Sequence, residues 1–148
     1  MGGTGRMADV RDAALRDARE LARLFTELGH AATEDDIVAR WNAWHAGGNV
    51  GIVVDGAEGE LIGAATLHQA AVLHRPKPIG RISALIVDAR HRNEGIGRAL
   101  LDAAEQMFRD AGCGMIEITS NMRRTDAHAF YAHLGYELTS ARFMKPLA

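Results

Sequence analysis

The sequence predicts a single mixed α/β domain. Apolar runs of strand-like composition alternate with segments whose apolar residues recur every three or four positions, which is the spacing of a helix. A length of 148 residues is typical of one domain, and 47% hydrophobic with 24% charged residues is the balance of a soluble globular protein. The sequence has no internal repeat or linker, so we expect residues 7–148 to form one domain after a flexible lead-in or tag remnant over residues 1–6.

A short strand and two helices are expected in the first third of the chain. Residues 8–11 are typical of a strand, and residues 13–28 form an amphipathic helical pattern that Gly29 ends. Thr33 has the side chain of a helix N-cap and precedes three acidic residues, which the positive end of a helix dipole favours. A second helix is therefore expected from Thr33 to about Trp44.

The remainder of the chain predicts further strands and helices. A turn rich in glycine and acidic residues joins the next two strands, and glycines end both later helices. The strands are expected over residues 50–54, 61–73, 81–87, 115–120 and 136–144, and the helices over residues 95–111 and 125–134.

Composition and charge argue against several classes of protein. Seventeen Lys and Arg residues against nineteen Asp and Glu give a formal net charge of -2, which disfavours a nucleic-acid binder that relies on bulk charge. No apolar run reaches the ~20 residues of a membrane span, and no signal peptide is expected. Cys113 is the single cysteine, which fits a reducing cytoplasm. The histidines show no metal-ligand spacing, so no metal is expected.

The strongest chemical signal lies at residues 92–97, between the strand over residues 81–87 and the following helix. The first amides of a helix have no internal partner and the dipole is positive there, so this end attracts an anion. Gly95 and Gly97 let a phosphate approach the backbone, and Arg92 can add charge-assisted hydrogen bonds. The segment predicts a pyrophosphate cradle. A tight strand-to-helix turn that uses glycine only for its backbone angles is the alternative.

Three kinds of phosphate site compete for this segment. A Walker loop needs a Gly-Lys-Ser/Thr sequence, which the segment lacks. A dinucleotide fingerprint needs a third glycine where Leu100 stands, and the acidic Glu117 falls inside its strand rather than at the end. The third kind is a coenzyme A site.

Two motifs in the chain resemble those of one enzyme family. Residues 92–97, with the pattern Arg-x-x-Gly-x-Gly, are similar to the acyl-CoA motif of the GCN5-related N-acetyltransferase (GNAT) family. Residues 124–136, with Tyr131 on a short helix before a Gly-Tyr pair, resemble the family's second motif. The likeness is strongest over residues 81–144 and extends over nearly the whole chain. It implies a central mixed, mostly antiparallel sheet with splayed fourth and fifth strands, flanked by about four helices.

The resemblance implies an acetyl-CoA-dependent enzyme that transfers an acetyl group directly to a primary amine. In this family the pantetheine arm lies between the splayed strands and pairs like an extra strand. Backbone groups of residues 85–87 would then lie beside the thioester and could supply an N–H for the developing oxyanion. The residues that the resemblance assigns to acetyl-CoA binding are Leu85, Ile86, Val87, Arg92, Asn93, Glu94, Gly95, Ile96, Gly97, Arg98, Asn121, Arg124 and Tyr131.

The expected catalytic residues follow from the same resemblance. Tyr131 matches the general acid, because a phenol with a pKa of about 10 is protonated at neutral pH and can donate to a departing thiolate. Packing within the last helix is the alternative for this residue. The family's glutamate base on the fourth strand falls at Ser83, which cannot act as a base at neutral pH. Glu117 and His68 are candidates for that task, and an exposed strand position explains each of them as well.

The sequence does not identify the acceptor amine. Trp41 and Trp44 fit helix packing and, in this family, also the wall of the acceptor site. The acidic residues 34–36 and Asp55 favour a cationic acceptor only where they face the cleft, and a solvated helix start is the alternative. A homodimer is compatible with the resemblance. Two other functions compete with acetyl transfer. The chain could sense acyl-CoA without turnover, or it could bind a nucleotide with the same glycine turn.

Overall fold

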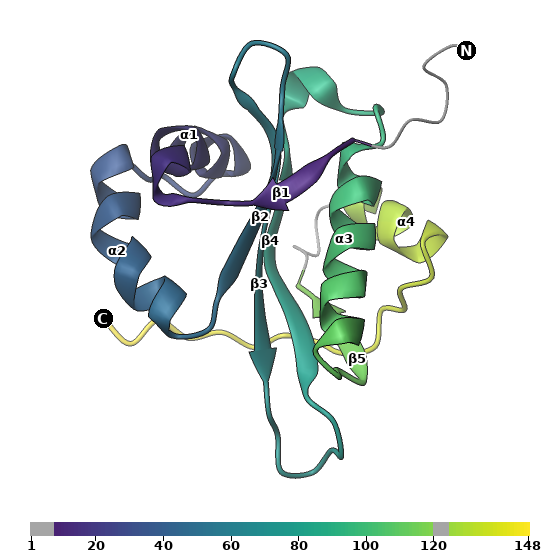
Figure 1. The fold of residues 1–148 in the computed structure, drawn as a ribbon. Helices are drawn as coiled ribbons and strands as arrows, with labels where there is room; N and C mark the ends of the chain where they lie inside the picture. The colour runs from purple at the N-terminus through teal and green to yellow at the C-terminus, as the bar shows by residue number, and fades with distance from the viewer. Residues whose placement is uncertain (1–7, 120–124) are drawn as a thin grey trace. The chain divides into compact units, whose positions relative to one another are not determined.

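A five-stranded sheet in the order β1-β2-β3-β4-β5 forms the centre of the first part of the chain (Figure 1). The computed structural model describes residues 8–119 and 125–148, and the chain divides into two compact units, residues 1–118 and 119–148. The strands are β1 (Val10–Asp12), β2 (Val50–Asp55), β3 (Leu61–Ala70), β4 (Ile79–Val87) and β5 (Met115–Ile118). The helices are η1 (Leu15–Asp17), α1 (Ala18–Leu28), α2 (Glu34–Ala46), η2 (Ala89–His91), α3 (Ile96–Asp110) and α4 (Thr125–His133).

The sheet is mixed, with three antiparallel strand pairs and one parallel pair. β1, β2, β3 and β4 pair antiparallel in succession, and β4 pairs in parallel with β5. A parallel pair requires a crossover connection, and α3 supplies it between the end of β4 and the start of β5 (Figure 1). The prediction of a mostly antiparallel sheet with about four helices is confirmed.

Helices cover both faces of the sheet (Figure 1). On one face, Leu21 and Leu24 of α1 pack against Val53, Ala64 and Ile86, and all five are at most 5% exposed. α2 packs beside α1 on the same side. On the other face α3 turns an apolar stripe to the sheet, whose buried members are Ile96, Ala99, Leu100, Leu101, Ala104 and Phe108. Burial of these two apolar layers is the main stabilising contribution to the fold. None of the described helices is long and apolar enough to cross a membrane.

The ends of the first two helices follow the predicted chemistry. α1 ends at Gly29, whose φ of 104° lies in the left-handed region that glycine tolerates best. At the start of α2, the Asp36 amide donates to Thr33 Oγ1 at 3.1 Å and the Thr33 amide donates to Asp36 Oδ2 at 2.9 Å. This reciprocal capping box stabilises the helix start. The bond from the Thr33 amide also lowers the pKa of Asp36 below its ordinary value.

Two glycines in the sheet allow α3 to approach it closely. A Cβ atom on Gly63 would lie 2.5 Å from Ile96 Cγ2, and one on Gly80 would lie 2.6 Å from two ring carbons of Phe108. Side chains cannot share space at such distances, so the absence of a side chain at these two positions sets the spacing between α3 and the sheet.

We expect the substitution Gly80→Ala to lower the free energy of unfolding by about 1–3 kcal/mol, the usual cost of an overpacked core. Phe108 is only 6% exposed, so its ring must shift within the core to accept the added methyl group. Gly47→Ala is the control, because Gly47 has a φ of -76° and its nearest neighbours would lie 3.4 Å from a Cβ. Urea unfolding measures both variants, and an unchanged midpoint for Gly80→Ala would contradict the packing.

The second unit contains α4 and an extended C-terminal segment. The predicted strand over residues 136–144 is wrong, because the structure places no strand there. Apolar residues in the segment favour a strand, but a strand also needs a neighbour for its backbone hydrogen bonds, and no ladder forms along the described residues of this unit. Leu138 and Phe143 remain 77% and 95% exposed. The helix expected from residue 13 is divided into η1 and α1, so that α1 begins at Ala18, and the short η2 was not predicted. The other predicted elements lie within about three residues of their expected bounds, and the predicted end of β5 at Ser120 lies outside the described residues.

Candidate active site

The parallel pairing of β4 with β5 covers only the first half of β4. The register begins at Ile79 with Met115 and ends where Ile82 meets Ile118. Residues 84–87 pair with β3 on one side, and no described strand pairs with them on the other. The second half of β4 therefore presents backbone N–H and C=O groups that an extended ligand can reach. This is the separation of the fourth and fifth strands that the sequence predicts.

A β-bulge lies at the point where β4 and β5 part. Thr66 pairs with Ala84 and Leu67 pairs with Ile82, which leaves Ser83 as an extra residue in β4. The Ser83 hydroxyl lies 2.7 Å from Thr66 Oγ1, and Ser83 Oγ also donates to the Thr66 carbonyl at 3.3 Å. The bulge brings Ser83 and Ala84 to the same side of the sheet, where both line the pocket described below.

The N-terminus of α3 lies at the end of β4 and carries no side-chain cap. Gly95 is the N-cap with a φ of 79°, and Asn93 before it is the one non-glycine residue with positive φ among those described, at 65°. The first bond of the helix joins the Ala99 amide to the Gly95 carbonyl at 3.0 Å, so the amides of residues 96–98 have no partner within the helix. No acidic residue stands in the first turn. These features fit the binding of an anion.

Side chains of the predicted cradle differ in what they can contribute. Ile96 is buried against Gly63, which pairs with Val87, so Ile96 can offer a ligand only its backbone amide. The Glu94 carboxylate lies 3.2 Å from His91 Nδ1, and Arg98 lies 4.0 Å from Asp102 while 63% exposed. Arg92 is exposed on the loop before α3. In β4, Leu85 and Val87 are half-buried, and Ile86 is buried toward α1. The predicted positions Asn121 and Arg124 lie outside the described residues.

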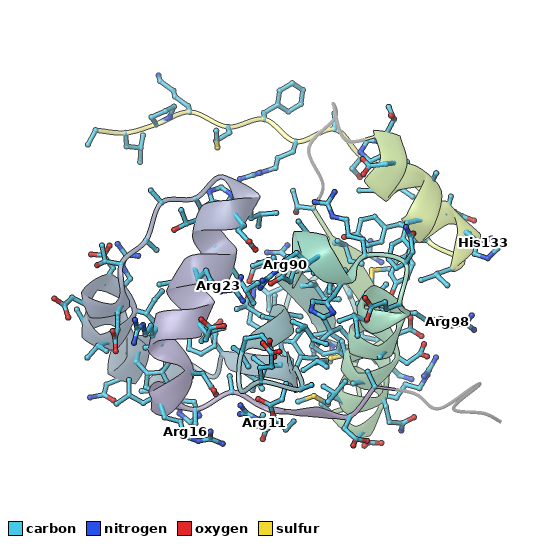
Figure 2. All side chains as sticks on the ribbon, turned by 90° about the horizontal axis from the view of Figure 1, so that it is seen from above. Arg11, Arg16, Arg23, Arg90, Arg98 and His133 are labelled. Atoms are coloured by element: carbon cyan, nitrogen blue, oxygen red, sulfur yellow. The ribbon has the colours of Figure 1, made fainter. Side chains whose placement is uncertain are left out.

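Asp88 anchors the loop that leads from β4 to α3. Its side chain is fully buried and forms ion pairs with Arg23 of α1 at 2.9 Å and with Arg90 of η2 at 3.3 Å. Figure 2 shows the two arginine side chains converging from their separate helices. The Arg90 amide also donates to Asp88 Oδ1 at 2.9 Å. Hydrogen bonds from Arg90 and Arg23 hold the pKa of Asp88 well below its ordinary value.

We expect Asp88→Asn to lower the free energy of unfolding at pH 7 by about 1.5–3 kcal/mol, the range for hydrogen bonds to a charged group. Because the folded-state pKa of Asp88 is lowered, its contribution is complete above the unfolded pKa of about 3.9 and is lost as the pH falls below that value. Urea unfolding of wild type and variant at pH 7, 5, 4 and 3 should show a difference that narrows below pH 4.

Asp102→Asn serves as the control for that series. Asp102 is 52% exposed and lies 4.0 Å from Arg98, so we expect less than about 0.5 kcal/mol at every pH. A difference between Asp88→Asn and wild type that stays constant from pH 7 to pH 3 would contradict the assigned ion pairs.

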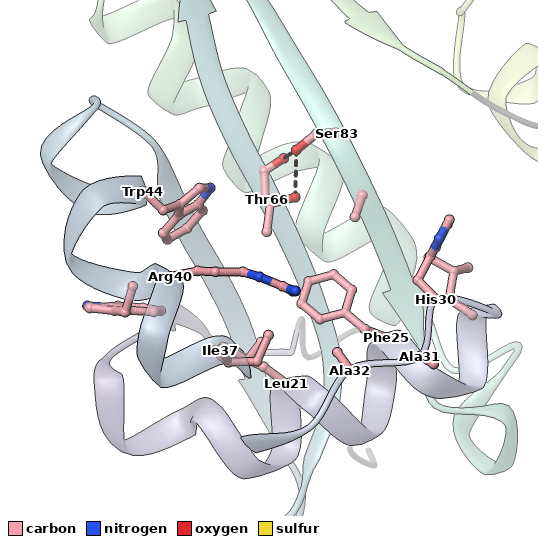
Figure 3. Close-up of a pocket in the computed structure, with 13 residues that line it drawn as sticks. Leu21, Phe25, His30, Ala31, Ala32, Ile37, Arg40, Trp44, Thr66 and Ser83 are labelled. Atoms are coloured by element: carbon pink, nitrogen blue, oxygen red, sulfur yellow. Dashed lines mark hydrogen bonds between the residues drawn. The ribbon is translucent and has the colours of Figure 1, made fainter. Parts of the chain in front are cut away.

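A pocket of about 380 Å³ lies between α1, α2 and the middle of β3 and β4 (Figure 3). We call it the tryptophan pocket. Its volume is in the range of sites for small molecules. It is lined by Leu21, Phe25, Leu28, His30, Ala31, Ala32, Ile37, Arg40, Trp41, Trp44, Thr66, Ser83 and Ala84.

Two tryptophans of α2 line the pocket, together with an arginine that sequence reasoning missed. Trp41 and Trp44 have ring centroids 5.3 Å apart, and Trp41 also packs against the core, so helix packing and a place in a pocket wall both fit. Arg40 also lines it, and its spacing from Ile37 and Trp44 would have placed it on the inward face of α2. The signal that could have identified Arg40 is its helical spacing from Ile37, Trp41 and Trp44, the larger apolar residues that line the pocket.

The candidate bases lie away from this pocket. Glu117 pairs with Arg81 across the parallel register, and its Oε2 accepts a hydrogen bond from Arg81 Nε at 2.9 Å while both side chains are 45% exposed. His68 lies opposite Arg81 on β3. Neither Glu117 nor His68 is among the residues that line the tryptophan pocket. Glu117 thus has an exposed strand position, whereas His68 is half-buried.

Tyr131 lies on α4 within the second unit. Its ring centroid is 5.5 Å from that of Phe130 and 6.0 Å from that of Tyr136, both in edge-to-face geometry. Tyr131 is half-buried and Phe130 is 36% exposed, so neither ring is buried within the second unit. No group of three His, Cys, Asp or Glu side chains that could hold a metal ion occurs in the part of the chain that the structure describes.

The mixed sheet, the parting of β4 from β5 and the uncapped start of α3 define an α/β domain of the acetyltransferase type. The model of the acetyltransferase (GNAT) family matches residues 15–136, and the chain belongs to this family. A crystal structure of an acetyltransferase from Trypanosoma brucei superposes with a TM-score of 0.83 at 22% identity and covers 94% of this chain and 99% of that chain. Glucosamine-6-phosphate N-acetyltransferase from Arabidopsis thaliana gives a TM-score of 0.81 at 16% identity over 97% of this chain and 100% of that chain. Both likenesses show the shared fold.

Sequence relatives cover a smaller part of the chain. The chain is 40% identical over 89 residues to the aminoalkylphosphonate N-acetyltransferase of Salmonella typhimurium, which is 60% of this chain and 58% of that protein. It is 33% identical over 86 residues to an aminoglycoside N(6')-acetyltransferase of Stenotrophomonas maltophilia, which is 56% of each protein. The chain thus spans little more than half the length of these curated relatives.

Proposed function

We propose that this protein is an acetyl-CoA-dependent N-acetyltransferase that transfers the acetyl group directly to a primary amine. The observation that carries the proposal is the uncapped N-terminus of α3 at the end of a strand with a free edge, in a chain of the acetyltransferase family. A helix N-terminus binds a pyrophosphate, and a free strand edge pairs with the amides of an extended arm. Together they fit the two halves of coenzyme A.

In this proposal, residues of the first unit bind acetyl-CoA mainly through their backbone. The amides of residues 96–98 bind the pyrophosphate, and Gly95 and Gly97 leave room for its approach. Arg92 and Arg98 are exposed and add positive charge. Asn93 and Glu94 lie in the same loop and are also proposed to contact acetyl-CoA. Residues 85–87 pair with the pantetheine arm. Asn121 and Arg124 are further proposed contacts.

The proposed chemistry is a direct attack of the acceptor on the thioester. The neutral amine nitrogen forms a bond to the carbonyl carbon, the C–S bond breaks, and the departing thiolate takes a proton from the phenol of Tyr131. A backbone N–H among residues 85–87 stabilises the oxygen that becomes negative. The proton released by the amine must pass to a base.

The side chains near the proposed thioester site offer few candidates for that base. Ser83 lines the pocket and stands where the family resemblance places a glutamate base, and a serine is no base at neutral pH. Glu117 is engaged by Arg81 and would have to leave that ion pair to accept a proton. An amine with a pKa of about 10.4 is only about 0.04% neutral at pH 7, whereas an acceptor of lower pKa lessens the need for an enzymic base.

We place the acceptor in the tryptophan pocket. The pocket has the size of a small-molecule site and reaches Ser83 and Ala84, next to the residues proposed to hold the thioester. Names of the relatives point to different acceptors, since one acts on aminoalkylphosphonates and another on aminoglycosides. The chemistry of the pocket must therefore decide between them.

A domain that binds acyl-CoA as a sensor is the second candidate, and the serine at position 83 favours it. A sensor needs the cradle of α3 but not a proton acceptor, and no acidic side chain lines the described pocket. Such a protein would bind acetyl-CoA and leave it intact.

Ligand-dependent thermal unfolding and thiol release test these proposals together. Coenzyme A and acetyl-CoA should raise the melting temperature, because a ligand that binds only the folded state stabilises it, whereas NAD and ATP should not. Stabilisation by NAD or ATP but not by the coenzyme A species would contradict the proposal. Release of thiol from acetyl-CoA over a panel of amines then separates an enzyme from a sensor. We further propose that residues 7–148 form the catalytic domain of a cytoplasmic protein, as a homodimer.

A further inference from the structure

The charge of the tryptophan pocket is unusual for a site that receives an amine. Most lining side chains are apolar or aromatic, and Arg40 is the one permanently charged side chain among the described residues that line it. Figure 3 shows Arg40 reaching from α2 across the pocket toward Phe25 of α1. Arg40 is exposed to solvent, and a cationic acceptor in the pocket would lie beside its guanidinium and be repelled by the like charge.

Arg40 has no ion-pair partner among the described residues, although ten other ion pairs form in the same part of the chain. The nearest acidic residue along α2 is Asp36, one turn earlier, which interacts with Arg40 only through longer-range electrostatics. The Asp36 carboxylate accepts the hydrogen bond from the Thr33 amide in the capping box. The guanidinium therefore keeps its five N–H donors available to a ligand.

The other acidic residues that would suit a cationic acceptor lie elsewhere. Glu34 and Asp35 are exposed in the first turn of α2 and do not line the pocket. Asp55 accepts a hydrogen bond from Arg11 Nε at 2.7 Å at the end of β2. Glu34 and Asp35 therefore lie at a solvated helix start, the alternative that the sequence left open for them.

From this arrangement we propose that the acceptor is a small amine that carries an anionic group, a carboxylate or a phosphonate, and that Arg40 binds that group. The inference rests on the proposed acetyltransferase function of the same site. A guanidinium binds a planar carboxylate or a tetrahedral phosphonate through two parallel hydrogen bonds. The faces of Phe25, Trp41 and Trp44 take the carbon skeleton of the acceptor, and its amine points to Ser83 and Ala84.

The volume of the pocket narrows the acceptor further. About 380 Å³ accommodates a compact molecule, and the aromatic residues leave few polar partners for a large polyhydroxylated one. Polyamines and aminoglycosides carry several positive charges and no anion, so they should be poor acceptors. All of these acceptors contain an amine, so the anionic group is what distinguishes the proposed substrate class from polyamines and aminoglycosides.

Matched acceptor pairs provide the test. Thiol release from acetyl-CoA is measured with phenylalanine against phenethylamine, and with 1-aminoethylphosphonate and alanine against ethylamine, where each pair differs by the anionic group. Spermidine and kanamycin represent polycations. We expect kcat/KM for at least one anionic member to exceed that of its counterpart without the anionic group about tenfold to a hundredfold, the effect of charge-assisted hydrogen bonds. The carboxylate and phosphonate arms show which anion is preferred.

Substitution of Arg40 links the preference to this residue. Arg40→Gln should remove the advantage of the anionic member and leave acetyl-CoA binding unchanged, and Arg40→Lys should retain part of it. Arg40→Glu should favour the member without the anionic group instead. Arg19→Gln is the matched control, since Arg19 is exposed on α1 and lines no part of the pocket. Its selectivity should equal that of the wild type.

Binding measurements separate failure of this inference from failure of the proposed function. The inference would be overturned if amines without an anionic group were acetylated as efficiently as those with one, and if Arg40→Gln did not change this ratio. The enzyme assignment would then remain intact. If no amine releases thiol, calorimetric titration of the same pairs in the presence of coenzyme A still tests the inference. Tighter binding of the anionic member, lost in Arg40→Gln, would support the inference. Equal binding of both members would overturn it.

Discussion

Gly97→Glu is expected to weaken the binding of coenzyme A at least about 100-fold, because placing like charges together costs several kcal/mol and each 1.4 kcal/mol is tenfold in affinity. Gly97 lies in the first turn of α3, whose amides at residues 96–98 have no partner within the helix. A carboxylate at position 97 would repel the pyrophosphate and would itself compete for these amides. Titration calorimetry with coenzyme A measures the loss.

The same substitution should leave the fold intact. Glutamate is a better helix former than glycine by roughly 0.5–1 kcal/mol, and a negative charge in the first turn of a helix is favourable. Ala57→Glu in the turn between β2 and β3 adds the same charge at an exposed position and should bind coenzyme A like the wild type. Micromolar affinity in a Gly97→Glu variant with an unchanged melting temperature would exclude the start of α3 as the cradle.

Features that depend on neighbouring residues in the chain could be predicted from the sequence. The helical spacing of apolar residues located α1, α2 and α3, and the N-cap chemistry of Thr33 located the start of α2. The turn before α3 could be predicted because an uncapped helix N-terminus depends on a few adjacent residues, here Gly95 and Gly97. The family assignment, which rests on two such local motifs, is confirmed.

Features that depend on distant partners were missed. Asp88 follows a strand like many loop residues, and only the fold brings Arg23 of α1 to within 2.9 Å of it. The tryptophan pocket exists because a bulge turns Ser83 and Ala84 toward α1 and α2. The strand expected over residues 136–144 was wrong because strand-like composition does not provide a pairing neighbour.

Tyr131→Phe is expected to lower kcat about 10²- to 10⁴-fold, the usual contribution of a positioned general acid. The substitution removes only the hydroxyl, so the ring can keep its edge-to-face contacts with Phe130 at 5.5 Å and Tyr136 at 6.0 Å. Without a proton donor, the thiolate must leave uncompensated, which slows the breaking of the C–S bond but not the binding of acetyl-CoA. Steady-state thiol release with an excess of acceptor measures kcat, and calorimetry measures the affinity.

Tyr136→Phe is the matched control, because the chain has two tyrosines and the same hydroxyl is removed from the neighbouring ring. It should change kcat less than about threefold, since only the Tyr131 hydroxyl is assigned to proton transfer. The pH dependence separates catalysis from packing. A phenol that must be protonated causes activity to fall at alkaline pH once it ionises, whereas deprotonation of the acceptor amine raises activity with pH. Tyr131→Phe should lose the falling limb and keep the rising one, and unchanged turnover across this pH range would exclude Tyr131 as the acid.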